Sequence, residues 1–246
     1  RGQAIGEALL RQHARTRAVF EDGGVIVDFR VRDLNLLAVR DGHESTTRTR
    51  ILENENYLWT DPTTVYYSSR LSHEREGTLA TALNLREELG RPLIICDPYA
   101  GVGPSLLPLI SEPDLIEELF AGDLNPSAVE FLRENIQHPS ATIECADARL
   151  LKERPEMCEK FDILLVNIPH ETLEHLPELL PLIRPRGLVR GWAIIEHSEF
   201  QDAQVRVRDI LGPEAELERR RSYSVSADLV QTFSRTRRYS RHRPES

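Results

Sequence analysis

The segment that most restricts the fold of this chain is a short apolar run that ends in an aspartate and is followed by a glycine turn. Residues 92–104 read Pro-Leu-Ile-Ile-Cys-Asp-Pro-Tyr-Ala-Gly-Val-Gly-Pro. The apolar run predicts a buried strand ending at Asp97, and residues 105–110 predict the start of a helix. A strand, a tight glycine turn and a helix form the nucleotide-binding corner of an open α/β sheet. Gly101 and Gly103 would let the backbone approach a ligand closely.

Three further predicted strands also end at polar side chains. Residues 119–123 end at Asp123, residues 141–145 precede Asp147, and residues 161–166 precede Asn167. A helix is expected over 72–89, before the first of these four strands. Further helices are expected at 127–136, 171–182 and 198–211, a fifth strand at 187–195, and two strands in the tail. This alternation predicts an α/β fold with a doubly wound, mostly parallel sheet and helices on both faces.

The beginning of the chain has a different pattern, and we expect residues 1–65 to form a small α+β domain before a sheet domain of residues 66–246. Apolar residues recur at helical spacing over residues 3–20, and Gly23-Gly24 is expected to end that helix. Residues 25–32 alternate as in a strand, and residues 46–52 and 57–60 predict two more strands.

Composition limits the classes of protein to consider. The 246 residues contain no apolar run near the roughly 20 needed to cross a bilayer, and no signal peptide stands at the start. The three cysteines lie far apart and form no metal-binding pattern. We therefore expect a cytoplasmic protein without a membrane segment or a metal ion. The net charge of −9 argues against a non-specific nucleic-acid binder, although nearly all positive charge is arginine, which suits phosphates and stacked bases.

The polar residues at the strand ends predict the ligand. In a parallel sheet they would face one crevice at the carboxyl edge, which suits a ligand with an amino-acid head, a ribose and an adenine. S-adenosylmethionine fits better than a dinucleotide, because no third glycine follows Gly103 in the dinucleotide pattern. Asp123 would accept from the ribose hydroxyls and Asp147 from the adenine amine, with the Ala148 backbone donating to the ring. Each aspartate could alternatively be a helix cap or a loop acid.

Several motifs together resemble the archaeal and eukaryotic tRNA (guanine-37-N1)-methyltransferases and their relatives, the aminocarboxypropyl transferases of the wybutosine pathway. These motifs are Asp97-Pro-Tyr-Ala-Gly-Val-Gly-Pro, Gly122-Asp-Leu-Asn-Pro-Ser-Ala, Glu134-Asn-Ile, Asp147-Ala-Arg and Val166-Asn-Ile-Pro. The segment from Val65 to Arg75 resembles the element that precedes the catalytic domain in that family. The resemblance covers about residues 25–235. It implies a class I methyltransferase-like fold, S-adenosylmethionine as cofactor and tRNA as substrate.

The resemblance also implies roles for individual residues. Glu74 is similar to the family's acidic catalytic residue, Arg32 to its catalytic arginine, and Asn167 to the asparagine of its Asn-Leu-Pro motif. Tyr99 stands where the family usually has phenylalanine. With the glycine turn included, the residues expected to contact the cofactor are Arg75, Asp97, Tyr99, Ala100, Gly101, Gly103, Asp123, Leu124, Asp147, Ala148, Asn167 and Pro169.

In the expected reaction Glu74 would remove the proton from guanine N1, and Arg32 would stabilise the charge that develops at O6. The base would leave its stack and lie against Tyr99, Tyr66 or Tyr67. Three alternatives stay open: an aminocarboxypropyl transferase, a non-catalytic RNA-binding protein with a methyltransferase-like fold, and a small-molecule methyltransferase. The Asn167–Pro169 motif favours methyl transfer over the first of them.

Overall fold

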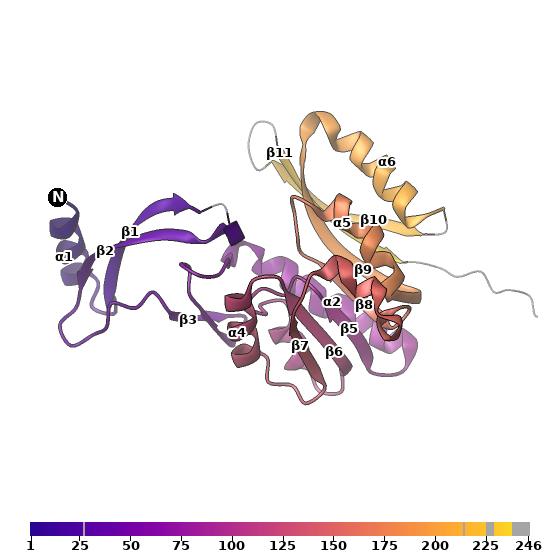
Figure 1. The fold of residues 1–246 in the computed structure, drawn as a ribbon, viewed down its shortest axis with the longest axis horizontal. Coiled ribbons are helices and arrows are strands. Elements are labelled where there is room, and N and C mark those ends of the chain that lie inside the picture. Colours follow the sequence, from indigo (N-terminus) through magenta and orange to yellow (C-terminus); the bar gives the residue numbers. More distant parts are fainter. Residues whose placement is uncertain (27, 214, 225–228, 238–246) are drawn as a thin grey trace, which may run out of the picture.

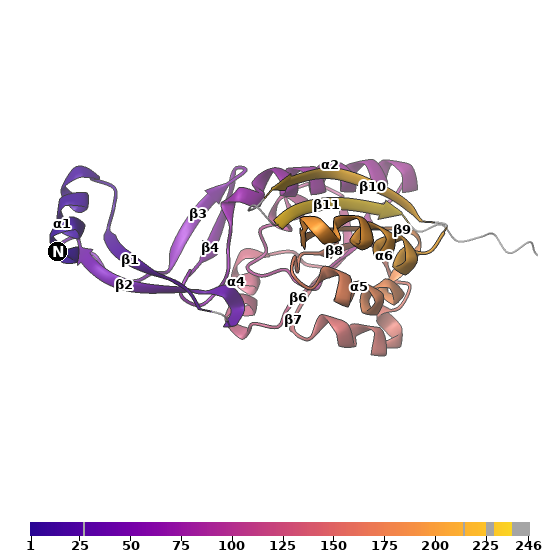
Figure 2. The same cartoon turned by 90° about the horizontal axis from the view of Figure 1, so that it is seen from above.

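The computed structural model describes residues 1–26, 28–213, 215–224 and 229–237, with side chains described up to residue 216 except at position 28. The molecule is elongated (Figure 1). A helix and two strands at the N-terminus, α1 (Gly2–Gln12), β1 (Ala18–Val25) and β2 (Arg32–Val39), lie at one end, away from a large sheet. Figure 2 shows the same separation from above. Among the described helices, none has the length and apolarity that spanning a membrane requires.

The large sheet has seven strands in the order β10-β11-β9-β8-β5-β6-β7. Its five parallel strands are β5 (Leu93–Asp97), β6 (Ile116–Asp123), β7 (Ala141–Cys145), β8 (Phe161–Val166) and β9 (Ile183–Glu196). β10 (Glu216–Ser224) and β11 (Leu229–Arg237) extend it in antiparallel fashion beyond β9. The chain runs outward from β5 through β6 and β7 and returns to the other side of β5 with β8. This reversal of direction creates a ligand-binding crevice at the carboxyl ends of the strands.

Alternate residues of the central strands pack into two separate cores, one on each face of the sheet. Ile163 and Leu165 of β8 join the core that includes helices α2 (Ser72–Leu89), α3 (Leu107–Ile110) and α4 (Pro126–Asn135). Leu164 and Val166 join the core that includes α5 (Thr172–Leu179) and α6 (Phe200–Leu211). A strand buried on both faces reads as a continuous apolar run, which explains the pattern of residues 161–166. The predicted mostly parallel sheet with helices on both faces is therefore confirmed.

The helices begin and end close to the predicted residues, with local exceptions. α4 begins where expected, because Asn125 caps it by accepting a hydrogen bond from the Ser127 amide at 3.0 Å and Pro126 occupies the first turn. The helix expected from residue 105 is reduced to the single turn of α3, since residues 101–106 form turns. The helix expected over 171–182 ends at Leu179 and continues as a short 3-10 turn.

The prediction for the first 32 residues is partly wrong. Residues 18–20 are not the end of a helix but the start of β1, which pairs with β2 through Ala18 and Val39. Gly23 does not end a helix either: the register shifts between Asp22 and Gly24, as in a β-bulge. Valine and phenylalanine favour strands, and pairing with β2 overrides the helical spacing. The continuous strand expected over residues 25–32 is not found: β1 ends at Val25, Asp28–Arg30 form a 3-10 turn, and β2 begins at Arg32.

A second hairpin, β3 (Thr49–Glu53) and β4 (Asn56–Thr60), is attached to the sheet body. Leu58 is fully buried in the core that includes α4. The Asn135 side chain accepts from the Trp59 amide at 2.8 Å and donates to the Trp59 carbonyl at 2.9 Å. These contacts join the hairpin to the sheet body, although it precedes the domain boundary expected at residue 65.

Candidate functional site

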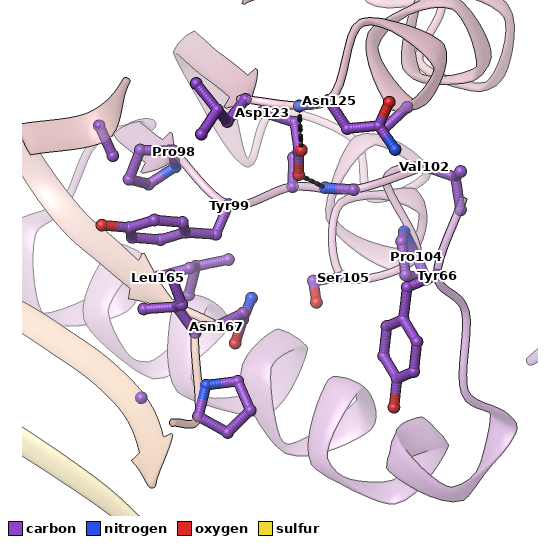
Figure 3. Close-up of a pocket in the computed structure, with 18 of the residues that line it drawn as sticks. Tyr66, Pro98, Tyr99, Val102, Pro104, Ser105, Asp123, Asn125, Leu165 and Asn167 are labelled. Carbon is purple, nitrogen blue, oxygen red and sulfur yellow. Dashed lines mark hydrogen bonds between the residues drawn. The ribbon is translucent and has the colours of Figure 1, made fainter. Parts of the chain in front are cut away.

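A cavity of about 480 Å³ lies where the strands of the parallel sheet end (Figure 3). Its wall contains the residues that follow four strands: 98–102 after β5, 123–125 at the end of β6, 146–149 after β7 and 167–171 after β8. Asp123, Asp147 and Asn167 therefore line a single pocket. Among the predicted cofactor residues, only Asp97 and Gly103 do not line it.

The glycine turn forms one wall. Gly101 and Gly103 have positive φ angles of 56° and 88°, which other residues adopt only with strain. A Cβ atom on Gly103 would also lie 2.9 Å from the side chains of Leu132 and Ile136, so a larger residue here would require those side chains to shift. The Gly101 amide donates to Asp123 Oδ2 at 2.9 Å, which joins the turn to the end of β6.

Backbone hydrogen bonds orient the carboxylate of Asp123. Its Oδ2 accepts from Gly101 and its Oδ1 accepts from the Asn125 amide at 2.9 Å, the two bonds dashed in Figure 3. Burial raises the pKa of this carboxyl, and the backbone donors counteract the rise. Each carboxylate oxygen keeps a further lone pair for a hydroxyl donor. Beside it, the Leu124 side chain is 58% exposed and lines the pocket, so it offers an apolar face to a ligand.

Asp97 lies beneath the glycine turn and is fully buried. Its Oδ1 accepts from the Tyr99 amide at 3.3 Å, whereas its Oδ2 has no hydrogen-bond partner within the described part of the chain. Burial raises the pKa of this carboxyl to about 8. This carboxyl therefore keeps its proton to a higher pH than a solvent-exposed aspartic acid does.

The surroundings of Asp147 shift its pKa in the opposite direction to that of Asp97. The Arg149 guanidinium forms an ion pair with it at 2.6 Å, and this contact lowers the pKa of the Asp147 carboxyl. The carboxylate stays ionised at the rim of the pocket, where it can accept from an amine. Ala148 is buried next to it and lines the same pocket.

On the other side of the pocket, the first turn of α2 presents Glu74. Its side chain is 14% exposed and forms an ion pair at 3.2 Å with Arg190 of β9. The next residue, Arg75, also lines the pocket, but its guanidinium binds Glu53 of β3 and the Ser68 carbonyl. Its expected contact with the cofactor stays a prediction.

Known proteins match this chain in sequence and in structure. A family model described as the TRM5/TYW2 methyltransferase domain matches residues 49–214. The chain belongs to this family. The resemblance inferred from the motifs is therefore confirmed.

Curated relatives in this family are tRNA (guanine(37)-N(1))-methyltransferases. Trm5b of Pyrococcus abyssi is 33% identical over 175 residues, which cover 70% of this chain and 48% of that protein. The enzyme of Dictyostelium discoideum is 30% identical over 178 residues, covering 70% of this chain and 36% of that protein. The chain thus spans half or less of the length of these relatives.

Solved structures of the TRM5/TYW2 family share the fold. The crystal structure of Pyrococcus abyssi Trm5b superposes with a TM-score of 0.74 at 24% identity, covering 96% of this chain and 68% of that one. Pyrococcus horikoshii TYW2 in complex with MeSAdo superposes with a TM-score of 0.73 at 16% identity, covering 97% and 84%.

The structure does not bring Arg32, the arginine expected from the family resemblance, into the pocket. Its side chain is 47% exposed and pairs with Asp22 at 3.3 Å on the N-terminal hairpin. Arg30 lines the pocket instead, with its guanidinium carbon 5.4 Å from the centre of the Tyr66 ring. Phe29 and Arg30 both have positive φ angles, 54° and 55°. Such angles are unusual for residues other than glycine, and they shape the turn between β1 and β2 that carries Arg30.

Tyr99, which stands where the resemblance led us to expect a phenylalanine, uses its hydroxyl group in a hydrogen bond. Its Oη lies 2.7 Å from Nδ1 of the buried His175, and His175 Nε2 lies 3.0 Å from Glu171. All three residues line the pocket. The sequence motifs did not identify His175, because nothing in them connects α5 with the glycine turn.

Arg190 and Thr78 are two further pocket residues that the sequence reasoning missed. One signal was present in the sequence. Arg190 interrupts the apolar run of a predicted buried strand, and arginine is rarely buried without a partner.

Proposed function

We propose that this protein is an S-adenosylmethionine-dependent methyltransferase that modifies N1 of guanine 37 in tRNA. The observation that carries the proposal is that Asp123, Asn167 and Glu74 line a single pocket in a member of the TRM5/TYW2 family. The curated relatives of this chain are named for this reaction.

The pocket residues fit the cofactor. Asp123 is placed to accept from two ribose hydroxyls, Leu124 offers an apolar face to the adenine, and Asp147 remains ionised to accept from the adenine amine. The glycine turn leaves room for close approach of the methionine part, since nothing lies within 4 Å of the position of a Cβ on Gly101. When bound, the cofactor supplies an electrophilic methyl group on a sulfonium.

The remaining residues act on the guanine. Its N1 carries a proton at neutral pH and must lose it to become a nucleophile, so Glu74 accepts that proton. Negative charge then develops on O6, and Arg30, which lines the pocket, takes the stabilising role first expected of Arg32. The Asn167 side chain points into the pocket (Figure 3), where its amide can orient the base. Tyr66, beneath Arg30, offers a ring on which an unstacked base can lie.

The second candidate is aminocarboxypropyl transfer, because the family includes TYW2. The Asn167-Ile-Pro169 sequence favours methyl transfer, and the loop is fixed by bonds to β9: the Pro169 carbonyl accepts from the Ile194 amide at 2.9 Å.

The proposal is tested with the cofactor labelled in its methyl group and two unmodified tRNA transcripts, one with guanine and one with adenine at position 37. Label should enter the guanine transcript alone. Equal labelling of both transcripts, or labelling of neither, would exclude the proposed target.

A further inference from the structure

Arg190 lines the pocket and contacts Glu74, the residue proposed to accept the guanine proton. It lies on β9, two residues after Leu188, which belongs to the core beneath α2. Because alternate strand residues share a face, Arg190 points toward α2 as well, and it is 6% exposed. A buried guanidinium requires acceptors, since desolvation without partners is costly.

Three acceptors of its hydrogen bonds lie on the first turns of α2. The Arg190 guanidinium donates to Glu74 Oε2 at 3.2 Å, to the Glu74 carbonyl at 2.9 Å and to Thr78 Oγ1 at 2.8 Å. The Thr78 hydroxyl in turn donates to the Glu74 carbonyl at 3.0 Å, so its oxygen is oriented to accept from Arg190. The guanidinium therefore donates hydrogen bonds to both the main-chain carbonyl and the side-chain carboxylate of Glu74.

We propose that Arg190 is a positioning residue that fixes the carboxylate of Glu74 toward the reacting base. This inference rests on the proposed function, in which Glu74 accepts the N1 proton. The planar guanidinium donates to both the main-chain carbonyl and the carboxylate of Glu74, and so restricts the rotamers of this side chain in the first turn of α2. A base displaced by about 1 Å loses on the order of 10²-fold in rate.

The contact also relates two distant parts of the chain. Arg190 pairs with Leu165 of β8 in the sheet, two residues before Asn167. The pairing of Leu165 with Arg190 therefore connects the loop that contains Asn167 with Glu74, the proposed general base. The distance between Glu74 and Asn167 is set by β8, β9 and α2 together. A positioning residue on β9 can therefore hold Glu74 relative to Asn167, which a residue on α2 itself could not do.

The test is a double-variant cycle with Arg190→Met and Glu74→Gln, in which kcat is measured at saturating cofactor and tRNA. As a single substitution, Arg190→Met should lower kcat by on the order of 10²-fold, while the Kd of the cofactor stays within about twofold. In the Glu74→Gln background the same change should have almost no further effect, because two residues that act as one unit are not additive.

Arg184→Met is the matched control. Arg184 lies on the same strand and pairs at 3.1 Å with the buried Asp162. This variant should lower the thermal midpoint without lowering kcat of the folded protein. If Arg190→Met does not fold, Arg190→Lys keeps the charge, loses the fork and enters the same cycle.

An equal loss of kcat in both backgrounds would overturn the inference, as would a parallel loss of kcat and cofactor affinity. A natural chain that modifies no tRNA would instead contradict the proposed function itself, so the two failures are distinguishable.

Discussion

The hydroxyl oxygen of Tyr99 lies 2.7 Å from Nδ1 of His175, and this contact joins the glycine turn after β5 to helix α5. The ring centroids are 5.8 Å apart with a tilt of 39°, so the hydrogen bond rather than stacking sets the orientation of the tyrosine. Burial raises the pKa of Tyr99, so its hydroxyl group is protonated at neutral pH and can donate to His175.

Replacing Tyr99 by phenylalanine should therefore weaken cofactor binding modestly. Loss of one neutral hydrogen bond of about 1 kcal/mol corresponds to roughly a fivefold increase in Kd by calorimetry. Tyr57→Phe, on the exposed face of β4, is the control and should leave Kd unchanged. A Tyr99→Phe protein that binds as tightly as the natural one would show that the hydroxyl does not position the turn for the ligand.

Asp123→Ala should abolish measurable cofactor binding. The substitution removes the acceptors for the ribose hydroxyls and also releases the Gly101 amide from the end of β6. Asp209→Ala, on the exposed face of α6, removes an equal charge outside the pocket and should have no effect. Unchanged affinity of the Asp123→Ala protein in calorimetry would contradict the assignment of this pocket to the cofactor.

Glu74→Gln should slow methyl transfer without weakening cofactor binding. The amide keeps the shape of the side chain and can still accept from Arg190, but it cannot accept the N1 proton. We expect methyl transfer to slow by roughly 10²–10⁴-fold in single-turnover assays while the cofactor Kd is retained. A variant that transfers methyl groups at the natural rate would show that another group is the base.

The buried carboxyl of Asp97 should make stability depend on pH. Its pKa is about 8 in the folded chain, and about 3.9 is typical of an unfolded one. Between these values the folded state holds a proton that the unfolded state lacks, so this group makes the free energy of unfolding fall as pH rises. The slope is at most about 1.4 kcal/mol per pH unit.

Asp97→Asn imitates the protonated carboxyl and removes this dependence. Urea unfolding at several values between pH 5 and pH 8 should show the stability of the natural chain declining relative to that of the variant. Parallel pH profiles would mean that Asp97 is ionised in the folded protein.

The sequence predicted the parts of the site that local chemistry determines. Asp123 ends an apolar strand and Asn125-Pro126 begins a helix within a few residues of it, so strand end, cap and turn could all be inferred from neighbouring letters. The same holds for Gly101, whose positive φ reflects a turn that the adjacent residues specify.

The parts that were missed depend on contacts between distant segments. Glu74 and Arg190 are separated by 116 positions, and only the packing of α2 against β9 brings them together. Arg30, rather than Arg32, reaches the pocket because two consecutive residues in the turn after β1 adopt positive φ, which no spacing rule anticipates. Residues 18–20 have helical spacing in the sequence but begin β1, because their pairing partner β2 lies beyond the turn.

The identity of the modified nucleoside tests the central claim most directly. Unmodified tRNA is incubated with the protein and S-adenosylmethionine, digested, and analysed by mass spectrometry with fragment mapping. We predict 1-methylguanosine at position 37 and nowhere else. A methyl group at another position, or a guanosine derivative carrying an aminocarboxypropyl group, would contradict the account.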